Sequence, residues 1–170
     1  MEQSEVYKEL DKFRKFVINE SKKNLRKYGK GGGDLEDSLD SRLKVNKNSF
    51  ELEFWMEDYG IYQDKGVSGT NKKYNTPFSY KQKAPPPKAF DKWIVKKGLT
   101  PRNSAGQFTS RKGLQFALSR FIFKNGIKPS LFFTRPFENA YKKLPEDLID
   151  KYGLDALKLF NETLYNLENG

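Results

Sequence analysis

The stretch SRLKVNKNSFELEFWME, residues 41–57, decides the fold of this chain, because its apolar side chains recur at every second position. Two alternating segments flank a polar turn at 46–48, and such alternation places apolar side chains on one face of a strand and polar ones on the other. The apolar positions are Leu43, Val45, Phe50, Leu52, Phe54 and Met56. The stretch therefore predicts an antiparallel β-hairpin with one face toward a core.

Segments with helical periodicity surround the hairpin. Apolar residues recur every three to four positions over 4–28 and 110–125, and a shorter helix is expected after Pro87. A further helix is expected from Pro145 to the end, and the apolar run 131–133 predicts a short strand. Together these segments predict an α+β fold, in which a small antiparallel sheet built on the hairpin is packed by N-terminal, central and C-terminal helices.

Glycines and prolines indicate how the chain is divided. The glycine-rich run 29–33 ends the first helix, so residues 1–28 are predicted as an N-terminal helix. Residues 29–144 are predicted as the α+β core and residues 145–170 as a C-terminal helix. Residues 66–88 have no usable periodicity and end in three prolines, which predicts a long basic loop insert that extends as an arm.

The composition excludes several classes of chemistry. The chain has 170 residues and contains neither cysteine nor histidine. Disulfides, thiolate nucleophiles, zinc fingers, iron–sulfur clusters and histidine general bases are therefore excluded. No segment approaches the ~20 apolar residues that a membrane span needs, and the acidic start MEQSEVYKEL lacks the pattern of a signal peptide. We expect a soluble protein with no cofactor and no metal.

The formal net charge of +10 is confined to the middle of the chain. Residues 65–128 hold 15 lysines and arginines and one acidic residue, Asp91, whereas the rest of the chain holds 17 basic and 21 acidic residues. A block of that charge is typical of a segment that binds a polyanion or an acidic protein surface. The alternative is a solvated loop region whose lysines only keep the protein soluble.

No group of residues indicates an enzyme. The glycines of 29–33 follow a helix rather than a strand and lack the Gly-Lys-Ser/Thr of a phosphate-binding loop, so we interpret them as a spacer. The acidic residues of 34–40 lack the pattern of a calcium loop and suit the start of a helix. Glu51, Glu53 and Glu57 share the outer face of the hairpin, where solvated or lysine-paired carboxylates are expected rather than an acid–base pair.

Rings alternate with cations in the basic block, which is typical of surfaces that bind single-stranded nucleic acid. An arm that lies across an acidic protein needs the same composition, so both partners stay open. In the helix over 110–125, Phe116 and Phe123 lie off the apolar stripe formed by positions 114, 118, 121 and 122, and need a second cover from the chain itself or from a neighbour. The candidate interface residues are Lys72, Lys73, Tyr74, Phe78, Tyr80, Lys81, Lys83, Lys88, Phe116 and Phe123.

Several segments, read in order, resemble those of one protein family. They are Gly33-x-Leu35-x-x-Ser38-Leu39, YGIYQDKGV at 59–67, WIVKKGL at 93–99, and the helix from 116 that runs into GIKPSLFF at 126–133. Their order and spacing over residues 30–140 resemble the tail-completion, or neck (head–tail joining), proteins of tailed bacteriophages. Val67 stands where the family usually has threonine, and the loop over 66–92 is longer than is common, which suggests an extra contact arm.

The resemblance implies a structural protein and not an enzyme. It implies a homo-oligomeric ring in the virion neck, assembled in the host cytoplasm and in contact with the portal and other neck or tail proteins. Genomic DNA would pass nearby without sequence-specific contact, and no membrane would be involved. Head-to-tail copies around an axis can close into such a ring.

Two alternatives remain. One is a basic nucleic-acid-binding module that uses Tyr74, Phe78, Tyr80 and Trp93 as stacking rings. The other is a carboxylate-dependent nuclease or hydrolase, which would need magnesium or manganese and would depend on Glu53.

Overall fold

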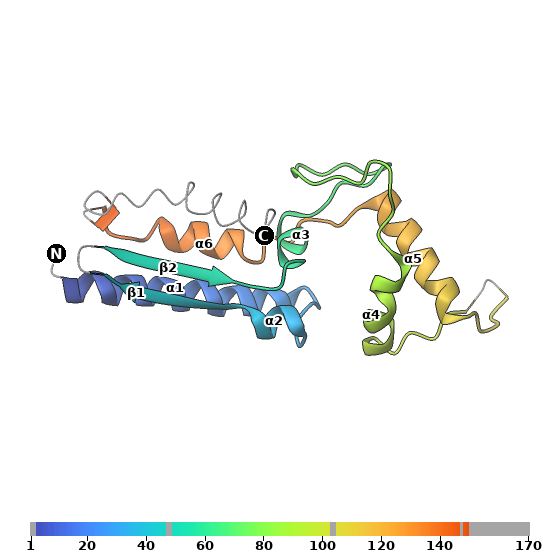
Figure 1. Ribbon diagram of the computed structural model, residues 1–170, viewed down its shortest axis with the longest axis horizontal. Coiled ribbons are helices and arrows are strands. Elements are labelled where there is room, and N and C mark those ends of the chain that lie inside the picture. Colours follow the sequence, from blue (N-terminus) through green and yellow to red (C-terminus); the bar gives the residue numbers. More distant parts are fainter. Residues whose placement is uncertain (1–2, 47–48, 103–104, 147, 150–170) are drawn as a thin grey trace. The chain divides into compact units, whose positions relative to one another are not determined.

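Two compact units share the chain. The computed structural model describes residues 3–46, 49–102, 105–146 and 148–149 (Figure 1). The first unit is formed by the described residues up to Asp64 and from Ser130 onward, and the second unit is Lys65–Pro129. This division separates residues 29–144, which the sequence predicts as one core. The α+β class is confirmed, because helices accompany a two-stranded antiparallel sheet.

The first unit is built on the predicted hairpin. Its strands are β1 (Asp40–Val45) and β2 (Phe50–Trp55), which pair in antiparallel register. The N-terminal helix α1 (Gln3–Lys27) packs against both strands and against α6 (Thr134–Tyr141) (Figure 1). The apolar face of α1, which repeats every 3.6 residues, and the apolar face of the hairpin, which repeats every two, thus pack together in one core, as the apolar pattern predicts.

Aromatic rings from three elements form the centre of this core. Phe13 of α1 contacts Phe54 of β2 and Phe137 of α6 edge to face, with ring centroids 6.3 and 5.3 Å apart. Phe54 and Phe137 contact each other in the same way at 5.9 Å. Edge-to-face packing is the favourable geometry for aromatic pairs, worth about 0.5–1.5 kcal/mol beyond area burial.

Two short helices connect the hairpin to its surroundings. α2 (Asp34–Ser38) is the predicted helical turn before the hairpin. α3 (Gly60–Lys65) follows the hairpin. Ser38 joins the two regions, because its hydroxyl accepts a hydrogen bond of 3.0 Å from the backbone N–H of Glu57.

The Leu131-Phe132-Phe133 run is the buried entry to α6, and the prediction of a strand there is wrong. Leu131 has a φ of 51°, in the left-handed region, and both phenylalanines are buried. The Asp64 carboxylate accepts hydrogen bonds from the N–H groups of Phe133 (2.8 Å) and Thr134 (3.1 Å), and from the Thr134 hydroxyl. Because this distant side chain caps the N–H groups, the apolar run turns into a helix.

The predicted C-terminal helix over 145–170 lies largely outside the described residues. Where the chain is described, the N–H groups of Leu148 and Ile149 donate to the carbonyl oxygen of Pro145 at 3.0 and 3.2 Å. Leu148 is fully buried in a second apolar cluster with residues of α1. The described start of this segment therefore makes one helical turn and contributes to the core.

The second unit contains the 3-10 helix η1 (Pro87–Phe90), α4 (Asp91–Lys96) and α5 (Arg111–Asn125). The boundaries of α5 are those predicted: the Ser110 hydroxyl accepts a hydrogen bond of 3.1 Å from the N–H of Gly113, which caps the helix. The sequence predicts that this central helix packs on the sheet. It belongs to the second unit, where it packs against η1 and α4.

The buried face of α5 also differs from the predicted stripe. Phe121 is 59% exposed, although its spacing predicts burial, while Ser119 is buried. The cause is polar anchoring: the Ser119 hydroxyl donates a 2.6 Å hydrogen bond to the carbonyl of Pro85, and the Gln115 amide donates one of 2.6 Å to Asp91. These bonds turn positions 115 and 119 toward Pro85 and the start of α4, and so Phe121 faces outward.

Candidate partner-binding surface of the basic unit

The second unit begins and ends at one backbone crossing. Val67 and Ile127 exchange N–H···O hydrogen bonds of 2.8 Å in both directions. Gly66 and Gly126 flank this bridge with φ values of 76° and 70°. A Cβ on Gly66 would lie 2.6 Å from the carbonyl oxygen of Ile127. Glycine is therefore required here for both backbone conformation and close approach.

The segment after the crossing, residues 66–80, is folded, although the sequence predicts an extended arm. The buried Ser68 hydroxyl accepts a hydrogen bond from the N–H of Tyr74 (2.9 Å) and donates one to the carbonyl of the same residue (3.1 Å). The Ser68 backbone pairs with the carbonyl of Phe78 and the N–H of Tyr80, both at 2.9 Å. These bonds close the segment into a defined loop.

This loop is anchored to the last turn of α5. The N–H of Thr70 donates to the carbonyl of Phe123 (2.9 Å), and the N–H of Asn71 donates to the carbonyl of Lys124 (2.9 Å). Carbonyls in the last turn of a helix have no partner within the helix, so the loop supplies the missing donors. The loop and the helix end thus form one structural piece.

Three lysine residues, two of which the sequence predicts as interface residues, lie where the loop meets the helix. The N–H of Lys72 donates to the carbonyl of Lys124 at 3.2 Å, and Lys73 follows directly; we call these three residues, which are neighbours along the backbone, the lysine cluster. Lys73 Nζ donates to the carbonyl of Gly69 (2.8 Å), and Lys72 Nζ lies 5.8 Å from the ring centroid of Tyr74. All three lysines are exposed, so the cluster presents positive charge to solvent.

The predicted interface phenylalanines have different environments. Phe123 is half-buried, and its ring contacts that of Tyr80 with centroids 6.2 Å apart, so the chain itself supplies part of its cover. Phe116 is 48% exposed. The second cover that the sequence requires is therefore present in the chain for Phe123 and remains to be supplied for much of the surface of Phe116.

The exposed face of α5 carries rings beside cations. At 100° per residue, Arg120 and Lys124 lie in the middle of this face, and Phe116 and Phe121 lie on either side of them. All four side chains are exposed. Phe121 is not among the candidate interface residues that the sequence indicates, because its spacing matches the apolar stripe.

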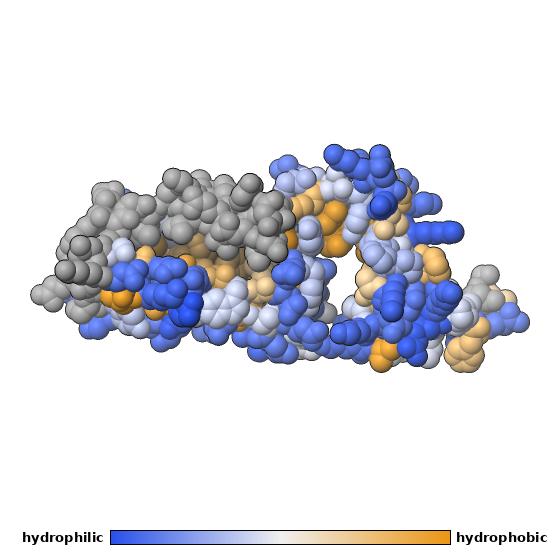
Figure 2. Space-filling view, in the orientation of Figure 1, coloured by the Kyte–Doolittle hydropathy of each residue, from blue (hydrophilic) through white to orange (hydrophobic). Residues whose placement is uncertain are grey.

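The remaining predicted lysines lie along the chain between the loop and α4. Lys81 and Lys83 precede the three prolines, and Lys88 lies on η1; all three are exposed. Figure 2 shows hydrophilic side chains over this part of the second unit, with small apolar patches between them. The candidate residues are thus spread over several segments of one unit rather than gathered around one point.

The basic block and the second unit are the same part of the chain. The unit spans Lys65–Pro129 and contains the 15 basic residues and the single acid of the block. That acid, Asp91, already accepts hydrogen bonds from Gln115 (2.6 Å) and from Arg111 (3.5 Å). A polar anchor within the unit therefore uses its one carboxylate side chain, and the unit's positive charge faces its surroundings.

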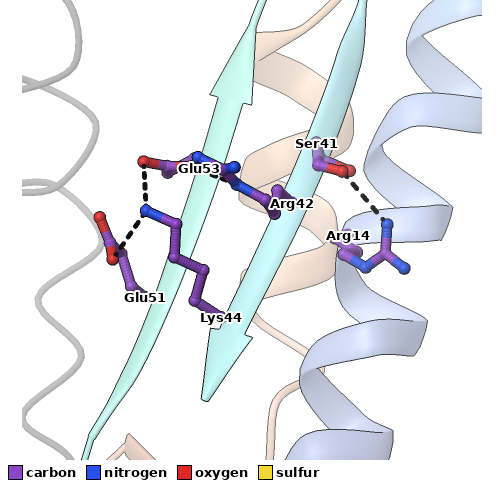
Figure 3. Close-up of polar contacts among 6 residues, drawn as sticks. All are labelled: Arg14, Ser41, Arg42, Lys44, Glu51 and Glu53. Atoms are coloured by element: carbon purple, nitrogen blue, oxygen red, sulfur yellow. Dashed lines mark hydrogen bonds and ion pairs between the residues drawn. The ribbon is translucent and has the colours of Figure 1, made fainter. Parts of the chain in front are cut away.

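The outer carboxylates of the hairpin pair with neighbouring cations (Figure 3). Arg42 Nε and Nη2 donate to the same oxygen of Glu53 at 2.9 and 2.8 Å, and Lys44 lies 3.3 Å from both Glu51 and Glu53. The hydrogen bond from Arg42, with that from Lys44, holds the pKa of Glu53 below its ordinary value. A carboxylate with a lowered pKa on an open strand face is poorly suited to act as a general acid.

Asp64 is the most deeply buried acidic side chain in the described part of the first unit, and it is not among the candidate residues that the sequence indicates. It is 2% exposed. Lys30 lies nearby in the fold, with its Nζ 2.6 Å from Oε1 of Gln63. Burial lowers the pKa of Lys30, and the negative charge of Asp64 partly opposes that shift. Only the acidic position within YGIYQDKGV could have indicated Asp64, and its role as a cap depends on the fold.

Among the described residues, no group of three or more His, Cys, Asp or Glu side chains is arranged to hold a metal ion. The helices in the same part of the chain include none with the length and apolar composition to cross a bilayer. Comparison of the chain with protein-family models, with curated proteins and with solved structures finds no match.

Proposed function

We propose that this chain is a structural protein of the neck of a tailed bacteriophage, where copies of it form a ring between the portal and the tail around the DNA channel. The proposal rests on the resemblance of its ordered motifs to tail-completion proteins. It also rests on where those motifs lie in the fold.

One observation carries the proposal: segments that are far apart in the sequence and carry the resemblance meet in the fold as scaffold. The motifs at 59–67 and 126–133 are joined by the Val67–Ile127 bridge. They are joined again by the hydrogen bond from Phe133 to Asp64, which is 2.8 Å long. Motif residues used in this way support a role in architecture rather than in catalysis.

The buried positions of the other motifs support the same interpretation. Leu35 and Leu39 belong to the core of the first unit, and Ile94 is buried in the second. These three side chains are aliphatic, so they supply no nucleophile or base for covalent catalysis. The motifs therefore fit a protein whose task is to hold its shape and present surfaces.

Neighbouring subunits are the proposed cover for the two exposed rings of α5. Phe116 and Phe121 are 48% and 59% exposed. Aromatic side chains that are exposed in the free subunit are often buried at the centre of a protein interface. Head-to-tail contacts between copies form a closed circular assembly when the rotation between subunits allows it.

Labelling of virions tests the location. Antibodies raised against the purified chain and coupled to gold are expected to bind at the head–tail junction of particles of the encoding phage, as seen by electron microscopy. Particles that contain the chain only in the capsid or tail tip, or that lack it, would contradict the proposal.

A complementation experiment tests the α5 face. A phage with a nonsense mutation in this gene is expected to yield heads and tails that do not join, and the wild-type chain is expected to restore joining. The double variant Phe116→Glu and Phe121→Glu is expected to fold, by circular dichroism, and to fail in joining. Phe108→Glu is the matched control, because Phe108 is an exposed ring outside α5 and should be dispensable.

A further inference from the structure

We propose that the second unit, Lys65–Pro129, binds double-stranded DNA through the phosphate backbone and without reading its sequence. The lysine cluster of Lys72, Lys73 and Lys124 is the centre of this surface. The inference goes beyond the neck assignment and does not depend on it, since it concerns what the purified chain binds.

The charge balance of the unit indicates a polyanion as its partner. The unit contains fifteen cationic side chains and one carboxylate. That carboxylate, Asp91, is hydrogen-bonded by Gln115 and Arg111. Duplex DNA carries one negative charge per about 1.7 Å of axis, which is among the densest arrays of charge that a protein meets. Binding to it releases condensed counterions, so each lysine that reaches a phosphate adds to affinity.

The fold presents the lysine cluster on a fixed platform. The loop bonds of 2.9 Å from Thr70 and Asn71 hold it on α5, and the backbone bond from Lys72 to Lys124 sets the distance between their chains. Lys73 uses one ammonium donor on the carbonyl of Gly69, and two donors remain for a phosphate. A platform of this kind loses less conformational entropy on binding than a mobile arm does.

The aromatic residues distinguish duplex from single-stranded DNA. Single-strand binding requires ring faces on which bases stack. Tyr80 contacts the ring of Phe123, and Lys72 lies over the ring of Tyr74. Phe78 is half-buried, with its carbonyl bonded to Ser68. Two of the four rings considered for stacking, those of Tyr74 and Tyr80, thus have contacts within the unit, and that of Phe78 is half-buried, whereas the cations remain at the surface.

The kind of cation distinguishes phosphates from an acidic protein. Of the 15 basic residues, 12 are lysines and three are arginines. Lysine is depleted at protein–protein interfaces and arginine is enriched there, because the guanidinium pairs with a carboxylate through two bonds. Lysine binds phosphate as a point charge and without base readout, which suits a sequence-independent contact.

Fluorescence anisotropy of the full purified chain with a fluorescein-labelled duplex of mixed sequence tests the proposal across a salt series. We expect binding to weaken steeply with salt. In a plot of the logarithm of the association constant against the logarithm of the salt concentration, each phosphate contact should contribute about −0.9 to the slope. The triple variant Lys72→Gln, Lys73→Gln and Lys124→Gln is expected to reduce the slope by about 2.7 and to weaken binding at least tenfold at about 0.1 M salt. The matched control removes three lysines of α1 in the first unit: Lys8→Gln, Lys12→Gln and Lys23→Gln.

The same titration includes two competitors that separate the partners. An unlabelled duplex should displace the probe more effectively than a single strand or poly-glutamate of equal charge concentration. Displacement by poly-glutamate as effective as that by duplex would overturn the proposal in favour of an acidic protein partner. Equal or tighter single-strand binding would overturn the duplex assignment.

Equal loss of binding in the two triple variants would also overturn the proposal, because it would show that binding depends on the net charge of the chain and not on this particular surface. Circular dichroism of both variants establishes that they are folded. A negative result leaves the neck assignment standing, since gold labelling of virions tests that assignment by itself.

Discussion

At the scale of single residues, Asp64 connects two distant parts of the first unit. Its carboxylate caps the entry to α6 across 69 and 70 residues of sequence, through the N–H groups of Phe133 and Thr134. A buried donor that loses its acceptor costs about 1–3 kcal/mol. The stability of the first unit therefore depends strongly on this one side chain.

Replacement of Asp64 by alanine is expected to lower the free energy of unfolding by about 3 kcal/mol, because buried N–H groups lose their acceptor. Urea denaturation at neutral pH measures the change. Asp58→Ala is the matched control: Asp58 is exposed, and its loss should cost less than about 0.5 kcal/mol. Equal effects of the two substitutions would refute the capping role.

Glycine at the backbone crossing gives a second prediction at this scale. Gly126→Ala is expected to destabilise the second unit by more than about 3 kcal/mol. The new Cβ would clash with the carbonyl oxygen of Val67, and the positive φ at this position is unfavourable for alanine. Gly98 also has a positive φ, of 60°, but a Cβ there meets nothing within 4 Å. Gly98→Ala should therefore cost only about 1–2 kcal/mol, and thermal denaturation compares the two.

At the scale of elements, a buried carboxylate joins the end of α1 to α2. Glu36 is buried and accepts hydrogen bonds from Arg26 Nε (2.6 Å) and from the N–H of Gly32 (2.7 Å). The bond from Arg26, followed by that from Gly32, holds the pKa of Glu36 below its ordinary value of 4.5. These contacts fix the glycine-rich joint that the sequence predicts as a flexible spacer.

The lowered pKa of Glu36 predicts a pH dependence of stability. The unfolded state binds the proton more readily, so the stabilisation is complete above pH 4.5 and is lost as the pH falls from there through the folded-state pKa. Urea denaturation between neutral and acidic pH should show this loss in the wild type and a smaller one in Arg26→Gln. Lys27→Gln removes an equal charge next to Arg26 and should keep the wild-type profile; a flattened profile in both variants would contradict the assignment.

The same scale shows what periodicity predicts and where it fails. The hairpin, α1 and the limits of α5 follow from local spacing, because each depends on side chains near in sequence. The outward turn of Phe121 does not, since it results from the bonds of Gln115 and Ser119 to segments that precede α5. The helix after Phe133 depends in the same way on Asp64, which spacing cannot reveal.

At the scale of the whole molecule, the charge pattern predicts the structural division better than the apolar pattern does. The basic block ends one residue before the second unit ends, and both begin at Lys65. The candidate lysines were predicted from that pattern, but their grouping with Lys124 required the loop bonds seen in the fold. The occupied state of Tyr74 and Tyr80 also depends on those bonds, which no local pattern encodes.

The way the chain returns to the first unit predicts that this unit folds by itself. The N–H of Leu131 donates to the carbonyl of Asp64 at 3.0 Å, so the two ends are neighbours. A variant with a short Gly-Ser linker in place of residues 65–129 is expected to keep the hairpin core and to unfold cooperatively in urea. Loss of cooperative unfolding would show that the second unit is needed for the first.

The bridge between Val67 and Ile127 also has a mechanical meaning. A domain at the end of a chain is tethered by a single covalent strand, whereas this unit is tethered by two that are clamped side by side. Tension on the unit is shared between both strands, and torsion works against their pairing. A protease that cuts one connecting segment leaves the other intact, so the second unit stays covalently attached to the first after a single cut.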